Sequence, residues 1–122
     1  MPDPAASEHF LAGRLLAALW TARLLAGDGG TPPEADGFPE KAVPAKLLDE
    51  GMKSLTGHLV AARSRGTDRW EAAAEVFRGI PALLPREVPD KTMGAGEQKA
   101  FTDGYAEQLA THAEKYGRLL KN

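Results

Sequence analysis

Apolar side chains recur at steps of three and four along the last part of the chain, from Glu97 to Leu120. These steps place six residues on one stripe of an α-helix: Phe101, Tyr105, Leu109, His112, Tyr116 and Leu119. The opposite face is charged: Lys99, Asp103, Glu107, Glu114, Lys115 and Arg118. A helix of this length spans roughly 35 Å. Because so long a stripe needs apolar partners throughout, we expect the other helices to be organised around this one.

The first half of the chain predicts two more long helices. One runs from Ser7, a favourable N-cap, to about Ala26. Its inward face is predicted to be Leu11, Leu15, Leu19 and Ala22. Gly13 inside it costs roughly 1 kcal/mol relative to Ala, which favours a position where another backbone comes close. The second begins at Pro44, which suits a first helical turn, and ends near Ser64. Its buried stripe is predicted to be Leu48, Met52, Leu55, Leu59 and Ala62.

A shorter helix and the connections complete the pattern. This helix is predicted from Thr67 or Asp68 to Gly79, with a buried side of Trp70, Ala73, Ala74 and Phe77. Residues 1–6 are expected to form a flexible arm. Residues 28–42, rich in Gly, Pro and acid, are expected to be mobile or ordered by a partner. No stretch in which apolar and polar residues alternate is long enough to predict a β-strand. The pattern therefore predicts a single all-α domain over residues 1–122, a bundle of about four helices with a long loop between the first two.

Composition narrows the class of protein. A length of 122 residues with 43% apolar content is typical of one globular domain. The absence of cysteine excludes disulfides, thiolate metal sites and a cysteine nucleophile, and fits a reducing compartment. The longest apolar run, Phe10 to Leu25, is interrupted by Arg14 and Arg23 and is too short to span a bilayer. No Lys or Arg precedes it, the reverse of a secretory signal. We expect a cytoplasmic protein with no membrane segment.

Residues that carry catalysis do not form a recognisable motif. The histidines, His9, His58 and His112, belong to no His-Glu-x-x-His or Glu-x-x-His pattern. His112 lies on the apolar stripe, where a hydrogen-bonded core residue is the more usual interpretation. No glycine loop follows a strand, as phosphate binding in nucleotide enzymes requires. The sequence therefore predicts a protein that is not an enzyme and has no cofactor or metal.

Cations are concentrated in the middle of the chain. Residues 51–86 hold six basic and three acidic residues, on a protein of net charge −2. Three arginines occur in the turn Arg63-Ser-Arg65-Gly-Thr-Asp-Arg69, with Lys53 before it and Arg78 after it. Arginines at such a corner can hold a phosphate backbone without reading bases. The alternative is a charged surface corner in which Arg65 and Arg69 pair with Asp68 or Glu71. Stacking of bases on the aromatic residues is a further possibility, although aromatics at helical spacing are more often core.

Four short motifs occur in order across nearly the whole chain. They are Gly13-Arg14-Leu15-Leu16-Ala17; Val43-Pro44-Ala45-Lys46-Leu47-Leu48; His58-Leu59 with Arg63; and Glu97-Gln98, Phe101, Gly104-Tyr105 and Gln108. In this order they resemble the C-terminal helical region of the large subunit in type I-C CRISPR effector complexes. That region can also exist as a separate polypeptide, the small subunit of the Cascade complex. The stretch Asp28 to Glu40 departs from it, because the matching segment is rich in aromatics and Phe38 is the only one here.

The resemblance implies a role in antiviral defence. Small subunits are non-catalytic helical bundles, usually in more than one copy, that contact the backbone and large subunits of the crRNA-containing complex. They are thought to stabilise the R-loop by holding the displaced single-stranded DNA. Carried to this chain, the DNA-binding role falls on the cations of the middle segment: Lys53, Arg63, Arg65, Arg69 and Arg78.

A second interpretation belongs to a different functional class. The alternative to the Cascade interpretation is a helical protein-interaction module, an adaptor or an inhibitor, that binds no nucleic acid. In that case the acidic loop of residues 28–42, rather than the arginines, is the expected contact.

Overall fold

Local sequence signals determine where the helices lie. The computed structural model describes residues 4–27, 30–39 and 41–120. Four α-helices and two short 3-10 helices make up the fold: α1 (Pro4–Leu25), η1 (Ala35–Gly37), α2 (Pro44–Ser64), α3 (Thr67–Gly79), η2 (Ile80–Leu83) and α4 (Ala95–Leu120). The described residues contain no strand, so the prediction of an all-α bundle of four helices is confirmed.

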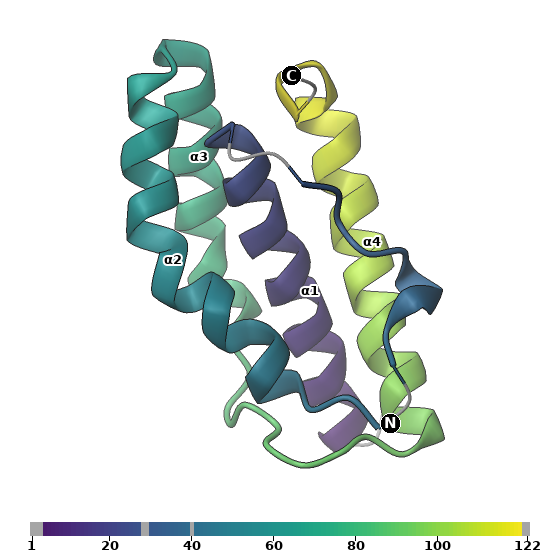
Figure 1. The fold of residues 1–122 in the computed structure, drawn as a ribbon. Coiled ribbons are helices and arrows are strands. Elements are labelled where there is room, and N and C mark those ends of the chain that lie inside the picture. The colour runs from purple at the N-terminus through teal and green to yellow at the C-terminus, as the bar shows by residue number, and fades with distance from the viewer. Residues whose placement is uncertain (1–3, 28–29, 40, 121–122) are drawn as a thin grey trace.

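Three of the helices run in the same direction. In Figure 1, α1, α2 and α4 run upward from the end marked N, and α3 runs back down beside α2. Because α1 and α2 run in the same direction, the connection between them has to run back along the full length of the bundle. Its described part does so along α4 (Figure 1). This parallel arrangement explains why the first loop is long while the α2–α3 turn is tight.

α1, rather than α4, is the central helix. It contacts α2, α3, α4 and η2, whereas α4 packs mainly on α1. From Ala12 to Leu25 every residue of α1 is buried or half-buried, and four buried alanines lie among them: Ala12, Ala17, Ala18 and Ala22. Small side chains allow neighbours to approach from every side, and a helix that is apolar all round belongs in the interior. The expectation that the chain is organised around α4 is therefore wrong, although the buried stripe of α4 is confirmed for Phe101, Tyr105, His112 and Tyr116.

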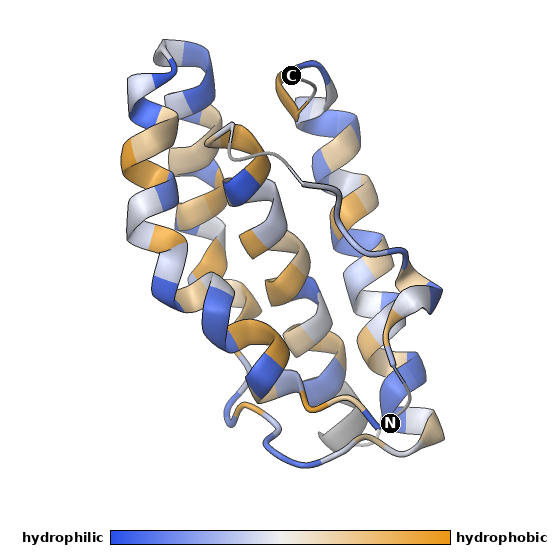
Figure 2. Cartoon of the chain, in the orientation of Figure 1, coloured by the Kyte–Doolittle hydropathy of each residue, from blue (hydrophilic) through white to orange (hydrophobic). Residues whose placement is uncertain are grey.

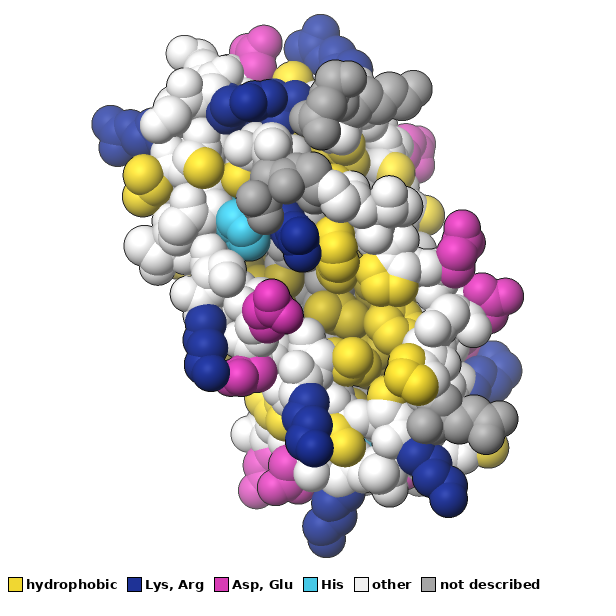
Figure 3. Space-filling model, in the orientation of Figure 1, with side chains coloured by type: hydrophobic (Ala, Val, Ile, Leu, Met, Phe, Trp, Pro, Cys, Tyr) yellow, Lys and Arg dark blue, Asp and Glu magenta, His cyan; other side chains and the backbone are white. Residues whose placement is uncertain are grey.

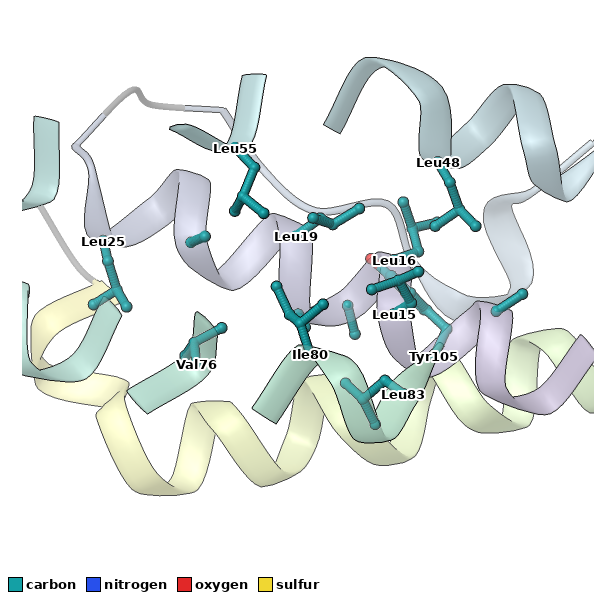
Figure 4. Close-up of a cluster of buried hydrophobic side chains, with 14 of the residues drawn as sticks. Leu15, Leu16, Leu19, Leu25, Leu48, Leu55, Val76, Ile80, Leu83 and Tyr105 are labelled. Carbon is teal, nitrogen blue, oxygen red and sulfur yellow. The ribbon is translucent and has the colours of Figure 1, made fainter. Parts of the chain in front are cut away.

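Figure 4 shows how the core is layered around α1. Leucines of α1 lie between Leu48 and Leu55 of α2 on one side and Val76, Ile80 and Leu83 of α3 and η2 on the other. The buried side of α3 is Ala72, Ala73 and Val76. Phe77 is 48% exposed and Met52 of α2 is 43% exposed, so both were wrongly predicted as core. The neighbouring helices pack against a face of α3 that is rotated about the helix axis from its aromatic face.

The loop after α1 has anchors inside the chain. Phe38 is buried, with edge-on contacts to Phe101 (ring centroids 5.4 Å apart) and Tyr105 (4.9 Å). The Tyr105 hydroxyl donates to the carbonyl oxygen of Pro33 at 2.6 Å. Gln98 Nε2 lies 3.5 Å from the carbonyl oxygen of Phe38. These contacts hold residues 33 and 38 against α4. The mobility of this loop stays a prediction, and residues 28, 29 and 40 lie outside the described part.

The first helix begins earlier than predicted. α1 starts at Pro4 rather than Ser7, and proline is favoured at a first helical position. The arm predicted over residues 1–6 is therefore wrong for residues 4–6, and residues 1–3 lie outside the described range. The predicted ends at Ser64 and Gly79 are confirmed.

Candidate nucleic-acid interface

The turn between α2 and α3 carries three of the five cations predicted to bind nucleic acid. Figure 2 shows this turn as a hydrophilic end of the helix pair. Gly66 makes the turn with φ at +117°, a left-handed conformation that favours glycine. Arg63, Arg65 and Arg69 lie on either side of it, next to the C-terminal end of α1. The sequence-predicted corner therefore exists, but its arginines differ in what they contact.

Arg69 supports the end of the central helix. Its Nη1 atom donates to the carbonyl oxygens of Leu24 (3.2 Å) and Leu25 (3.1 Å). These carbonyls belong to the last turn of α1, beyond which no helical residue donates to them, although that of Leu24 also accepts from the backbone N–H of Gly27. A cation at this end also complements the helix dipole. Arg69 is thus a structural cap of α1, a contact that the sequence pattern did not predict.

Arg63 and Arg65 point to opposite sides of α2. The Arg63 guanidinium lies over the Trp70 ring, 5.4 Å from its centroid, on the side of α3. The Arg65 guanidinium packs against Gly27 on the side of α1, where an added Cβ would come within 2.6 Å of its Cζ. Gly27 has φ at +75°, a conformation that favours glycine, whereas the Arg65 side chain could move to admit a Cβ. Residues two apart on a helix do not share a face, and the three arginines therefore form no single cluster.

Lys53 and Arg78 lie away from the corner. Lys53 is twelve residues before Arg65, roughly 18 Å along the helix axis, and forms an ion pair with Asp49 at 2.9 Å. The hydrogen bond that Lys53 donates to Asp49, together with the negative charge of that carboxylate, raises the pKa of Lys53. Arg78 is exposed near the lower end of α3. The structure thus places the five predicted cations on several faces of the bundle. Arg63, Arg65 and Arg69 lie at one end of it, and the other two cations lie elsewhere.

A groove opens between α1, α2 and the loop of residues 30–39. It has a volume of about 300 Å³. Its walls combine apolar and polar side chains: Leu16, Leu19, Trp20, Arg23, Pro33, Phe38, Leu47, Glu50, Gly51, Ser54 and His58. Figure 3 shows it as a hollow of hydrophobic side chains with charged groups at its edge. We call this feature the α1–α2 groove.

The α1–α2 groove contains a cation that the sequence analysis did not select. The Arg23 guanidinium stacks over the Trp20 ring, 4.7 Å from the centroid, and both residues line the groove. In the sequence Arg23 counted only as a charge interrupting an apolar run. The signal available in the sequence was spacing. Arg23 follows Trp20 by three residues near the end of a helix, and this spacing places a guanidinium over an indole ring.

The interior holds a polar chain that belongs to the fold. Arg14 Nε donates to Gln108 Oε1 (3.0 Å), and Gln108 Nε2 lies 2.8 Å from His112 Nε2. His112 Nδ1 lies 3.0 Å from Thr21 Oγ1, whose own proton goes to the carbonyl oxygen of Ala17 (2.9 Å). Because the Thr21 hydroxyl donates to Ala17, it accepts from Nδ1, and Nε2 of His112 accepts from Gln108. The interpretation of His112 as a hydrogen-bonded core residue is confirmed.

Electrostatics keeps that histidine neutral. Burial lowers the pKa of His112 below its ordinary value, and the positive charges of Lys115 and Arg14 add to the effect against a smaller opposing effect of Glu75. A second charged cluster lies nearby, where the Tyr116 hydroxyl donates to Glu75 Oε1 at 2.5 Å and Lys115 pairs with the same carboxylate. The hydrogen bond from Lys115, followed by that from Tyr116, lowers the pKa of Glu75. These contacts tie α3 to α4.

Several other functional classes find no support in the described part of the chain. No group of three or more His, Asp or Glu side chains is arranged to hold a metal ion. None of the described helices is long and apolar enough to cross a membrane. In comparisons with known proteins, no family model matches the chain, and no match is found among curated proteins or solved structures.

Proposed function

We propose that this chain is a non-catalytic small subunit of a type I CRISPR surveillance (Cascade) complex. In this role it contacts the crRNA-bound backbone and the large subunit, and holds displaced single-stranded DNA by electrostatic contacts that stabilise the R-loop. The observation that carries the DNA-binding part is the arrangement of Arg63 and Arg65 at one end of the bundle, where Arg69 fixes the end of α1. Such cations position a phosphate backbone without reading its sequence.

The motifs behind the family resemblance also support the proposal, because two of them meet in the fold. Arg14 donates to Gln108, and Gly13 lies against the main chain of Phe101 and Tyr105. Residues of two motifs, 94 positions apart, thus form one contact between α1 and α4. Two unrelated short similarities would not be expected to meet in the fold, and this meeting supports the proposal.

The first experiment is a mild affinity purification of the tagged chain from its own host, with co-purifying protein and RNA identified. We expect a repeated backbone subunit and a short crRNA. Recovery of the chain alone, or with an unrelated protein and no RNA, would refute the Cascade assignment.

Direct DNA binding needs variants that spare the structural cap. We expect the double variant R63E/R65E to abolish binding to single-stranded DNA at low salt, with Arg69 left intact because it caps α1. The control K91E/K99E makes the same change in net charge elsewhere and should keep most of the binding. For the parent chain, log affinity should fall with log salt by about 0.7 per phosphate contacted. Equal binding by both double variants would show that the corner is not the site.

A second function, a protein-interaction module, is favoured by one specific observation. The outer side of the α2–α3 pair exposes large apolar residues: Val60 is 62% exposed and Phe77 is 48% exposed. In the acidic loop, Glu34 and Asp36 are also exposed. Under this alternative, R63E/R65E would leave partner recovery unchanged, while Val60→Asp or a charge reversal in the loop would abolish it.

A further inference from the structure

The α1–α2 groove has the dimensions and lining of a site for one small planar group. Its volume of about 300 Å³ is at the lower end of the range for small-molecule pockets. Leu16, Leu19 and Leu47 supply apolar walls, and Trp20 and Phe38 supply aromatic ones. Polar groups stand at the same walls, with Ser54 on α2 as a hydroxyl donor and acceptor. A nucleobase has the matching character, because its faces are apolar and its edge carries donors and acceptors.

Charge distribution indicates how the rest of such a ligand would lie. His58 lines the groove and is two helical turns, about 10 Å, from Arg65 on the same face of α2. Arg23 lines the opposite wall, on α1. The carboxylate of Glu50 lines the groove two turns before His58, away from Arg65. A phosphate attached to a base in the groove is therefore favoured towards the Arg65 end and disfavoured towards Glu50.

We infer that the α1–α2 groove receives one unstacked nucleobase from the single strand whose phosphates contact the Arg65 end of the bundle. This inference rests on the proposed function. The proposed function includes only electrostatic contacts with phosphates, and the inference adds insertion of a base into the groove. Insertion of a base is sequence-tolerant when recognition is by contact with its faces, as in other single-strand binding proteins. An apolar side chain of a protein partner is the competing occupant, and the test below separates the two.

The first test uses the fluorescence of Trp20. The chain has two tryptophans, so the variant W70F leaves Trp20 as the single reporter inside the groove. An unstructured single-stranded oligonucleotide and one of equal length made of abasic sites have the same phosphates and differ only in bases. We expect the intact strand to change Trp20 emission and to bind about tenfold more tightly than the abasic one.

The second test fills the groove. Ser54 and Thr56 both carry hydroxyls on α2, but only Ser54 lines the groove, whereas Thr56 is exposed elsewhere on the helix. S54L should reduce the preference for intact over abasic DNA to near unity, and T56L should leave it unchanged. Circular dichroism of both variants checks that helicity is kept, and the abasic comparison on the parent chain does not depend on any groove variant.

The outcomes separate the inference from the proposed function. Salt-sensitive binding that is equal for intact and abasic strands overturns base insertion and leaves the electrostatic role standing. An unchanged preference in S54L also overturns it. Absence of binding to either strand refutes the DNA-binding function and the inference together. A Trp20 response produced by a purified Cascade subunit but by no DNA would assign the groove to a protein side chain.

Discussion

Gly13 of α1 and Gly104 of α4 lie in the same helix crossing, and each faces the main chain of the opposite helix. A Cβ atom built on Gly13 would overlap the carbonyl oxygen of Phe101, and one built on Gly104 would overlap that of Phe10. The main chains themselves therefore set the separation of α1 and α4. This close crossing lies one helical turn before the Arg14–Gln108 hydrogen bond and allows side chains along both helices to meet. The prediction that Gly13 admits a nearby backbone is confirmed.

Adding a methyl group at either glycine of the crossing should destabilise the bundle. Because the overlapping atoms belong to the main chain, they cannot rotate away, and α1 must separate from α4. We expect G13A and G104A each to lower the free energy of unfolding by about 3 kcal/mol or more, at or above the upper end of the usual cost of overpacking. Urea denaturation followed by circular dichroism measures this.

The matched control is Gly117, near the other end of α4, where an added Cβ meets no atom within 4 Å. G117A should leave stability unchanged or raise it by up to about 1 kcal/mol through helix propensity. If G13A proves as stable as G117A, the two helices are not held at main-chain contact.

Removal of the Arg69 cap should weaken the end of α1. Its Nη1 atom donates to two carbonyls of the last turn, and hydrogen bonds from charged donors contribute roughly 1.5–3 kcal/mol. We expect R69A to lower the unfolding free energy by about that amount and R69K to recover little of it, since lysine lacks the planar fork. Arg78, exposed on α3, is the control, and R78A should have almost no effect. Equal stability of R69A and R78A would contradict the capping role.

The neutral state of His112 makes stability depend on pH. Because burial and nearby cations lower its pKa in the fold, the unfolded chain takes up a proton more readily than the folded one. The stabilisation is therefore complete above the unfolded-state pKa of about 6.5 and is lost as the pH falls towards the lower folded-state pKa.

Denaturation series at pH 7, 6 and 5 test this dependence. We expect the parent chain to lose stability over this range more steeply than H112Q, which lacks the titrating group. Two histidines remain in that variant, so the difference between the curves reports His112 alone. Parallel curves would mean that His112 is not held neutral by the fold.

The loop of residues 30–39 should depend on Phe38. This side chain is buried against Phe101 and Tyr105, and truncation of a buried phenylalanine costs about 3–5 kcal/mol. We expect F38A to destabilise the bundle by that order and to speed amide exchange throughout residues 30–39. F77A removes the same side chain from a half-exposed position and should cost far less. Rapid exchange of this loop in the parent chain would support the mobility predicted from its sequence.

Helix positions were predictable because their causes are local. Proline at Pro44 and glycine at Gly66 act through their own backbone preferences. The stripe of α4 follows from side-chain spacing alone. The face of α3 was not predictable in the same way, because Trp70 and Phe77 suggested an aromatic core face and α1 instead packs against the alanines beside them.

In the candidate site, too, relationships between neighbouring residues were predictable and contacts between distant segments were not. The sequence identified Arg63, Arg65 and Arg69 as neighbours at a turn, which is a local relationship, and the structure keeps them there. It could not reveal that Arg69 caps α1, since Leu24 and Leu25 are 45 and 44 residues away. Nor could it reveal the α1–α2 groove, whose walls come from three separate segments.

The sequence by itself thus determined the number of α-helices, most of their ends and the turn at Gly66, because propensity, capping and periodicity are properties of neighbouring residues. Tertiary structure alone decided that α1 is central, that the first loop runs back along α4, and that the arginines face different sides of the bundle. These outcomes depend on which surfaces fit together over the whole domain. Gly13 signalled in the sequence that some backbone comes close, but only the fold shows that this backbone is α4 and that Gly104 faces α1 in the same crossing.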